Sequence, residues 1–81
     1  MIDRLLGKKV VGIKQVKKAL SDDKGLKLYV AKDADSKLIV PIVDMAKEKD
    51  IDIEYVSTMK HLGKMCGIEV GAATTLILKE E

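Results

Sequence analysis

The chain has 81 residues and a net charge of +2, which allows one small domain, residues 1–81, and gives only a mild preference for polyanions. Its composition, 47% hydrophobic and 35% charged, excludes a disordered chain, and two tyrosines without phenylalanine or tryptophan require an aliphatic core. A single cysteine excludes an internal disulfide, and neither a signal-peptide pattern nor an apolar run of about 20 residues is present, so we expect a cytoplasmic protein with no membrane partner.

Apolar residues in the first half of the chain alternate between the period of a strand and that of a helix. Residues 2–6 are compatible with one helical turn, and residues 9–13 with a short strand. Residues 14–23 follow as a helix, and residues 25–31 as a strand entered through a turn. That helix should bury one face, formed by Ile13, Val16, Ala19 and Leu20.

The second half repeats the alternation, with a helix, a strand, a helix and a strand over residues 33–50, 51–56, 57–67 and 73–78. Asp35 or Ser36 should cap the first of these helices, and Ser57 or Thr58 the second. Pro41 removes one backbone hydrogen-bond donor inside the predicted helix of residues 33–50. The order predicts an α/β fold, a three-layer α/β/α sandwich with one mixed sheet of about four strands and helices on both faces.

Residues for enzymatic chemistry are scarce. His61 and Cys66 are five apart on a predicted helix and point in different directions, so neither a nucleophile–base pair nor a zinc site is expected. We expect His61 on a solvated face and Cys66 as a small buried side chain. Asp33 and Asp35 lack the further oxygen ligands of a calcium loop, and helix capping is their expected role. We therefore expect no catalysis, no cofactor and no metal.

One predicted helix begins with a cluster of polar side chains. At about 100° per residue, Lys14, Gln15 and Lys18 share an exposed face, and Gly12 precedes them without a Cβ. A helix N-terminus adds free N–H groups and a partial positive charge, which suit a phosphate. Lysine can donate to a guanine edge, and glutamine can donate and accept. The cluster favours a nucleic-acid contact, although lysines on a helix are most often only solvated.

An apolar–acidic–apolar triplet, Ile68-Glu69-Val70, stands between Gly67 and Gly71, where a surface loop is expected. Water-facing loops gain nothing from isoleucine and valine. The triplet therefore either packs into the core or forms a binding surface. The loop and the turn at Gly12 should meet at the strand ends of the sheet, where ligands bind in α/β domains.

Three stretches, VVGIKQVKKAL, VAKDAD and LGKMCGIEVGAA, resemble the ribosomal protein L-seven-Ae and L-thirty-e superfamily, the kink-turn RNA-binding proteins, and above all its short bacterial, ribosome-associated members. The resemblance covers about residues 7–78. It implies an α/β/α sandwich that binds a kink-turn, in which a helix, a short bulge and sheared G·A pairs fold into a sharp bend. Archaeal and eukaryotic members carry Asn-Glu where this chain has Lys14-Gln15, so contacts to the sheared pairs should differ in detail.

The resemblance assigns roles to individual residues. Gly12, Lys14 and Gln15 would lie at the G·A pairs, and Lys18 would hold a phosphate or a neighbouring base edge. The triplet would cover the bulged nucleotides, with two exposed apolar side chains beneath unstacked bases and one carboxylate as a hydrogen-bond acceptor. Lys32, at the end of its strand, would add a backbone contact. The implied site consists of Gly12, Lys14, Gln15, Lys18, Lys32, Ile68, Glu69 and Val70.

The resulting interpretation is a monomeric RNA-binding protein whose partner is a structured RNA that contains a kink-turn. Two alternatives stay open. A protein–protein adaptor that docks through the loop of residues 67–71 would bind with little response to salt and would leave Lys14, Gln15 and Lys18 without a role. A small hydrolase would need the acid–base pair that the chain lacks, and its turnover would collapse on His61→Ala.

Overall fold

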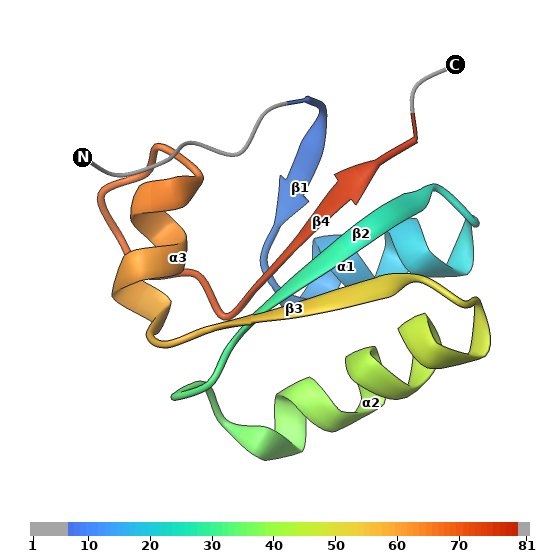
Figure 1. Ribbon diagram of the computed structural model, residues 1–81, viewed down its shortest axis with the longest axis horizontal. Helices are drawn as coiled ribbons and strands as arrows, with labels where there is room; N and C mark the ends of the chain where they lie inside the picture. Colours follow the sequence, from blue (N-terminus) through green and yellow to red (C-terminus); the bar gives the residue numbers. More distant parts are fainter. Residues whose placement is uncertain (1–6, 80–81) are drawn as a thin grey trace.

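One mixed four-stranded sheet runs through the molecule in the order β1-β4-β2-β3 (Figure 1), and the computed structural model describes residues 7–79. The helical turn predicted over residues 2–6 lies outside that range. β2 and β3 are parallel, whereas β4 is antiparallel to both of its neighbours, β1 and β2. The strands are β1 (Lys9–Val11), β2 (Gly25–Ala31), β3 (Asp52–Val56) and β4 (Thr74–Leu78).

Helices cover both faces of this sheet, as predicted. They are α1 (Ile13–Ser21), α2 (Ser36–Glu48) and α3 (Met59–Met65). The pleat of β2 shows the division, because successive side chains of a strand point to opposite faces. Leu28 and Val30 pack in the cluster that α1 and α2 cover, and Tyr29 and Ala31 pack in the cluster beneath α3. The mixed sheet and the α/β/α layers confirm the predicted fold class.

The larger cluster comes from the periodicity seen in the sequence. Val16 and Leu20 are fully buried on α1, Ile42 on α2, and Leu28 and Leu76 on the sheet. Each such aliphatic side chain contributes about 1.5–3 kcal/mol when it leaves water. The predicted buried face of α1 is confirmed, with Ile13 as its half-buried member. This cluster fixes the position of α1 against the strands and therefore the direction of its N-terminus.

Element ends differ from the prediction where the backbone turns. β1 ends at Val11, two residues early, because Gly12 has φ +106° and already serves as the N-cap of α1. α1 ends at Ser21 because Asp23 adopts φ +57°, and α2 ends at Glu48 ahead of Asp50 with φ +55°. A residue with a positive φ ends a helix, although the apolar pattern of the preceding residues gives no sign of that end. Pro41, by contrast, lies on the exposed side of α2, and the helix continues through it.

Three polar side chains accept hydrogen bonds at the N-termini of α2 and α3. Asp35 caps α2, accepting a bond from the Lys37 N–H at 2.9 Å, and Thr58 caps α3, accepting from the His61 N–H at 3.0 Å. The Asp33 carboxylate accepts from the Met59 N–H at 2.8 Å, so the loop after β2 also holds the start of α3. Capping is thus the role of both aspartates. Over residues 7–79, no cluster of potential metal ligands occurs, and no helix is long and apolar enough to cross a bilayer.

Candidate nucleic-acid interface

The candidate site lies at one end of the sheet, where β1 ends, β4 begins and β2 and β3 end (Figure 1). Backbone hydrogen bonds tie these strand ends together directly, so their relative positions are fixed. The N–H groups of Gly12, Ala31 and Lys32 donate to the carbonyl oxygens of Thr74 (3.0 Å), Ala73 (2.9 Å) and Val56 (2.8 Å), respectively. The loop of residues 67–71 feeds β4 at this same end, as predicted.

Gly12 makes the turn from β1 into α1. Its φ of +106° and ψ of 159° lie in a region that is essentially restricted to glycine. The side chain of Gln15 folds back over it, because a Cβ at this position would lie 2.7 Å from the Gln15 Oε1 atom. Gly12 therefore allows both the sharp turn and the close approach of the carboxamide to the helix start.

The first turn of α1 presents its polar groups to solvent. Lys14, Gln15 and Lys18 are all exposed. No side chain caps the helix, and among the described residues the N–H groups of Ile13, Lys14 and Gln15 have no partner. The Val16 N–H is the first to bond within the helix, to the Gly12 carbonyl at 3.0 Å. An uncapped helix end beside two ammonium groups can accept an anionic ligand.

α3 ends in a Schellman motif that sets the course of the loop. Gly67 takes φ +78°, and its N–H donates to the Lys64 carbonyl at 3.0 Å. The next N–H, of Ile68, donates to the Gly63 carbonyl at 3.0 Å. In this motif the residue after the turn commonly packs back onto the helix.

Ile68 follows that rule, and its predicted exposure is wrong. Its side chain is half-buried and packs against the cluster beneath α3, which contains Leu62 and Ala72. Val70 is exposed, at 70%, and Glu69 is exposed as well. The triplet therefore divides its roles, with Ile68 half-buried against the core and the other two side chains on the surface.

Two glycines bring the loop backbone into direct contact with α3. A Cβ on Gly63 would lie 2.1 Å from the Val70 carbonyl oxygen, and a Cβ on Gly71 would lie 3.1 Å from the Met59 Cβ. The Ala72 N–H then donates to the Met59 carbonyl at 3.0 Å. The end of the loop is consequently packed directly against α3.

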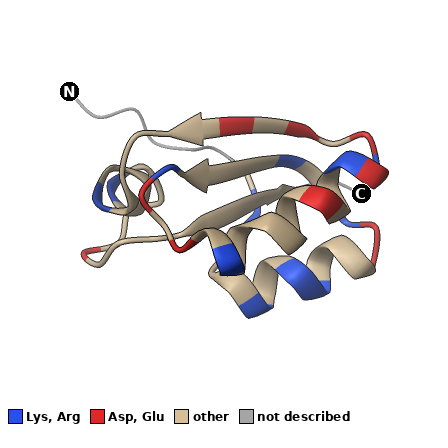
Figure 2. Cartoon of the chain, turned by 90° about the horizontal axis from the view of Figure 1, so that it is seen from below, with Lys and Arg blue, Asp and Glu red and all other residues tan. Residues whose placement is uncertain are grey.

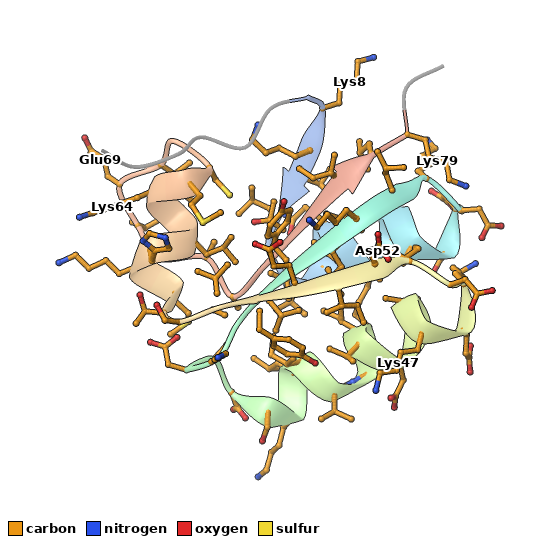
Figure 3. All side chains as sticks on the ribbon, viewed as in Figure 1. Lys8, Lys47, Asp52, Lys64, Glu69 and Lys79 are labelled. Carbon is orange, nitrogen blue, oxygen red and sulfur yellow. The ribbon has the colours of Figure 1, made fainter. Side chains whose placement is uncertain are left out.

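Several contributors to this surface were not assigned from the sequence. Gly63 and Asp33 lie in the stretches that carry the family resemblance, but they and Met59 were not assigned to the site, and in the structure they support the loop and α3. Lys64 is exposed on α3, on the same side of the molecule as Glu69 in Figure 3. Lys32 is exposed at the end of β2 as expected. The supporting roles of Gly63 and Met59 could have been found only from the close contact of α3 with the loop.

Charge is distributed unevenly over the fold. α1 carries lysines and no acidic residue, whereas β3 carries Asp52 and Glu54, as Figure 2 shows. Glu54 pairs with Lys27 at 3.0 Å. The hydrogen bond with that carboxylate raises the pKa of the Lys27 ammonium, and the polar end of the Tyr29 side chain adds to the shift. The acidic edge thus lies on the strand farthest from β1 in the sheet order, while the first turn of α1 is free of acids.

The two residues considered for catalysis are separated in the structure. His61 is exposed on α3, and its backbone N–H takes part in the Thr58 cap. Cys66 is half-buried beneath α3, with its Sγ atom 3.0 Å from the Thr75 hydroxyl on β4. The thiol therefore faces the sheet, whereas the imidazole ring lies on the exposed side of the helix.

The division within the triplet predicts opposite results for two serine substitutions. Ile68→Ser should lower the free energy of unfolding by about 1–2 kcal/mol and the melting temperature by about 5–10 °C, because it removes apolar contacts beneath α3. Val70→Ser should leave the melting temperature nearly unchanged, because its side chain is already in water. Thermal unfolding followed by circular dichroism measures both. Equal losses for the two variants would contradict this assignment.

Comparison with known proteins gives the family. Residues 5–81 match the ribosomal protein L7Ae/L30e/S12e/Gadd45 family. The chain belongs to this family. The match covers both halves of the candidate site, from the turn at Gly12 to the loop before β4, and confirms the resemblance seen in the sequence.

Relatives cover nearly the same length. An RNA-binding protein of Caldanaerobacter subterraneus subsp. tengcongensis is 47% identical over 74 residues, which are 91% of this chain and 90% of that protein. An RNA-binding protein of Bacillus pumilus is 49% identical over 69 residues, covering 85% and 84% of the two chains. Among solved structures, the Giardia lamblia 15.5kD RNA binding protein has a TM-score of 0.82 at 19% identity, over 90% of this chain and 62% of that one. That likeness supports the shared fold.

Proposed function

We propose that this protein binds RNA and that it recognises and stabilises kink-turns. The observation that carries the proposal is the convergence, at one sheet end, of the uncapped start of α1, with its exposed lysines, and a loop that packs on α3 and has an exposed apolar tip. Membership of the family, and the relatives that are named RNA-binding proteins, support RNA as the ligand. The protein would act without catalysis, as a monomer in the cytoplasm.

The start of α1 would contact the sheared G·A pairs. The Lys14 ammonium can donate to guanine O6 and N7, and the Gln15 carboxamide can both donate to and accept from a base edge. The free N–H groups of the first turn can bind a phosphate oxygen, with the helix dipole favouring the negative charge. Because Gln15 is folded toward Gly12, its exposed carboxamide lies at the helix start.

The loop of residues 67–71 would cover the nucleotides of the bulge. Unstacked bases expose apolar faces, and Val70 offers an apolar side chain that is already exposed. The Glu69 carboxylate can accept hydrogen bonds from a base or from a ribose hydroxyl. Ile68, which is half-buried, supports this loop from beneath in the proposal, and only its exposed part is available to the RNA.

Stabilisation would follow from selective binding. A flexible RNA samples extended and bent forms, and a protein that binds only the bent form shifts the population toward it. The backing of the loop by α3 favours this mechanism, because a rigid surface spends little binding free energy on its own ordering. We propose ribosomal RNA as one source of such kink-turns. Co-sedimentation of the protein with ribosomes would test whether it associates with them.

Substitutions in the first turn of α1 test the proposal. Lys14→Ala and Gln15→Ala should each weaken kink-turn binding by about ten-fold, because each removes a contact to a base edge worth about 1–3 kcal/mol. Both should also reduce the preference for the G·A pairs. Lys18→Ala should weaken binding and lower the slope of log affinity against log salt by about one unit, provided that Lys18 contacts a phosphate.

Gel-shift titration of a kink-turn duplex, beside the same duplex with Watson–Crick pairs in place of the G·A pairs, provides the measurement. Lys47→Ala is the matched control, since Lys47 is exposed in the last turn of α2, at the end of that helix farther from the site. Unchanged affinity in all three α1 variants would mean that this face is only solvated. Equal binding of the two duplexes would reduce the function to general RNA affinity, and binding of neither would favour the adaptor alternative.

A further inference from the structure

The loop after β2 holds the turn between β3 and α3 at both of its ends, and Figure 1 shows this loop beside the start of α3. At one end of the turn, the Lys32 N–H donates to the Val56 carbonyl at 2.8 Å. At the other end, the Asp33 carboxylate accepts a hydrogen bond from the Met59 N–H at 2.8 Å. Two consecutive residues of the loop therefore set where the first residue of α3 lies relative to the sheet.

Met59 in turn holds the end of the loop of residues 67–71. Its carbonyl oxygen accepts a hydrogen bond from the Ala72 N–H at 3.0 Å, and a Cβ on Gly71 would lie 3.1 Å from the Met59 Cβ. Gly71 directly follows Val70, whose side chain is 70% exposed. A continuous series of contacts thus leads from Asp33 through Met59 to the exposed apolar tip of the loop.

Capping of α3 does not by itself account for this carboxylate. The helix already has an N-cap of its own, because the Thr58 hydroxyl accepts from the His61 N–H at 3.0 Å. An N-cap residue directly precedes the helix that it caps. Asp33 instead reaches α3 from a loop 26 residues earlier in the chain. Its hydrogen bond therefore joins two separate segments and fixes the position of α3 as well as satisfying a backbone N–H.

We propose that Asp33 is a positioning residue for RNA binding. Through Met59 it holds the loop of residues 67–71 in the place where Val70 can cover the bases of the bulge. The inference rests on the proposed function and adds to it a residue that acts without touching the RNA.

The start of α1 is fixed by other contacts. Val16 is fully buried against the sheet, and the Gly12 N–H donates to the Thr74 carbonyl at 3.0 Å. The contact that α1 makes with the sheared G·A pairs in the proposal is therefore independent of Asp33. Loss of the Asp33 carboxylate should weaken recognition of the bulge and leave the preference for the G·A pairs intact.

Two kink-turn RNAs that differ only in the bulge test the inference. One carries its bulge bases, and the other has abasic residues there, so that the chain length is the same and only the bases are missing. Asp33→Ala should bind the first RNA about five-fold more weakly than the unchanged chain does, because the loop is displaced. It should bind the second RNA as the unchanged chain does. Gel-shift titrations are made well below the melting temperature of every variant, so that all proteins are folded.

Asp33→Asn is the conservative variant, because its amide oxygen can still accept a hydrogen bond from the Met59 N–H. Its affinity for the RNA with bulge bases should stay within about two-fold of the unchanged chain. Asp33→Ala should melt about 5 °C lower, and Asp33→Asn should recover most of that loss. Asp52→Ala controls for the lost charge, since Asp52 is exposed at the start of β3, away from the site, and it should bind both RNAs normally.

A double-mutant cycle with Val70→Ser separates positioning from direct contact. In that background Asp33→Ala should cost little further affinity, because the side chain that the loop positions is already gone. A full loss in that background would overturn the inference, because Asp33 would then contact the RNA itself. An equal loss on the two RNAs, no loss on either, or a loss in Asp33→Asn as large as that in Asp33→Ala would also overturn it.

The proposed function is tested separately by the unchanged chain. If that chain prefers the kink-turn over the duplex with Watson–Crick pairs, an overturned role for Asp33 leaves kink-turn recognition intact. If it has no such preference, the proposed function fails and the inference fails with it.

Discussion

Gly63→Ala is expected to lower the free energy of unfolding by about 2 kcal/mol, and with it the melting temperature by about 10 °C, although alanine is the better helix former. In an exposed helix the same change would stabilise by about 0.5–1 kcal/mol. Gly63 is instead buried within α3, and a Cβ there would lie 2.1 Å from the Val70 carbonyl oxygen.

This clash is costly to relieve, because it lies between the backbone of α3 and the backbone of the loop. The carbonyl belongs to the loop rather than to a flexible side chain, and Gly71 also lies close, its Cα 3.2 Å from the same Cβ position. The loop must therefore move away from α3, and Val70 and Glu69 move with it. We expect kink-turn affinity to fall by about ten-fold or more, which corresponds to about 1.4 kcal/mol of binding free energy.

Lys64→Ala is the matched control, because it places alanine at the next position of the same helix, where the side chain is exposed. Its melting temperature should stay within a few degrees of the unchanged protein. Circular dichroism melts and gel-shift titrations measure the two quantities in parallel. If Gly63→Ala melts at a higher temperature than the unchanged protein, the loop can move away from α3 without loss of stability. That result would contradict the tight packing of the loop on α3.

Periodicity predicted the elements well and their ends poorly. The apolar positions of α1 and the alternation along β2 follow directly from burial, so the helices, the strands and the two covered faces could be predicted from the sequence. Gly12, Asp23 and Asp50 end their elements because they adopt positive φ values. The apolar pattern does not predict these backbone angles, because none of the three residues belongs to it.

In the candidate site, too, the sequence predicted what helical spacing decides and missed what a tertiary contact decides. Lys14, Gln15 and Lys18 were placed on an exposed face correctly, because helical spacing alone decides it. Ile68 was misplaced, since its burial depends on the Schellman turn at Gly67 and on the return of the chain over Leu62. That return is a tertiary contact between residues of α3 and the loop, and it has no counterpart in the periodicity of either segment.

Gly12→Ala should destabilise the protein by about 1–3 kcal/mol, for a reason that differs from the clash at Gly63. Its φ of +106° with ψ of 159° is available to glycine, whereas an L-residue must strain or shift. A shift is opposed by the hydrogen bond from the Gly12 N–H to the Thr74 carbonyl and by the burial of α1 through Val16. The melting temperature should fall by about 5–15 °C.

The same Cβ would also disturb the proposed base contact, because it would lie 2.7 Å from Gln15 Oε1. The carboxamide is a flexible end and can swing away, so its displacement costs little stability but removes its position at the helix start. Kink-turn affinity should therefore fall in Gly12→Ala by about as much as in Gln15→Ala.

A double-mutant cycle separates the two effects. In a Gln15→Ala background the stability loss of Gly12→Ala should persist in full, because the strain lies in the backbone. Its affinity loss should nearly vanish, because the carboxamide is already gone. If the affinity loss instead remains complete, Gly12 acts by letting the RNA approach the backbone itself, and Gln15 is an independent contact. Under either result, the stability measurement alone decides whether the strain is real.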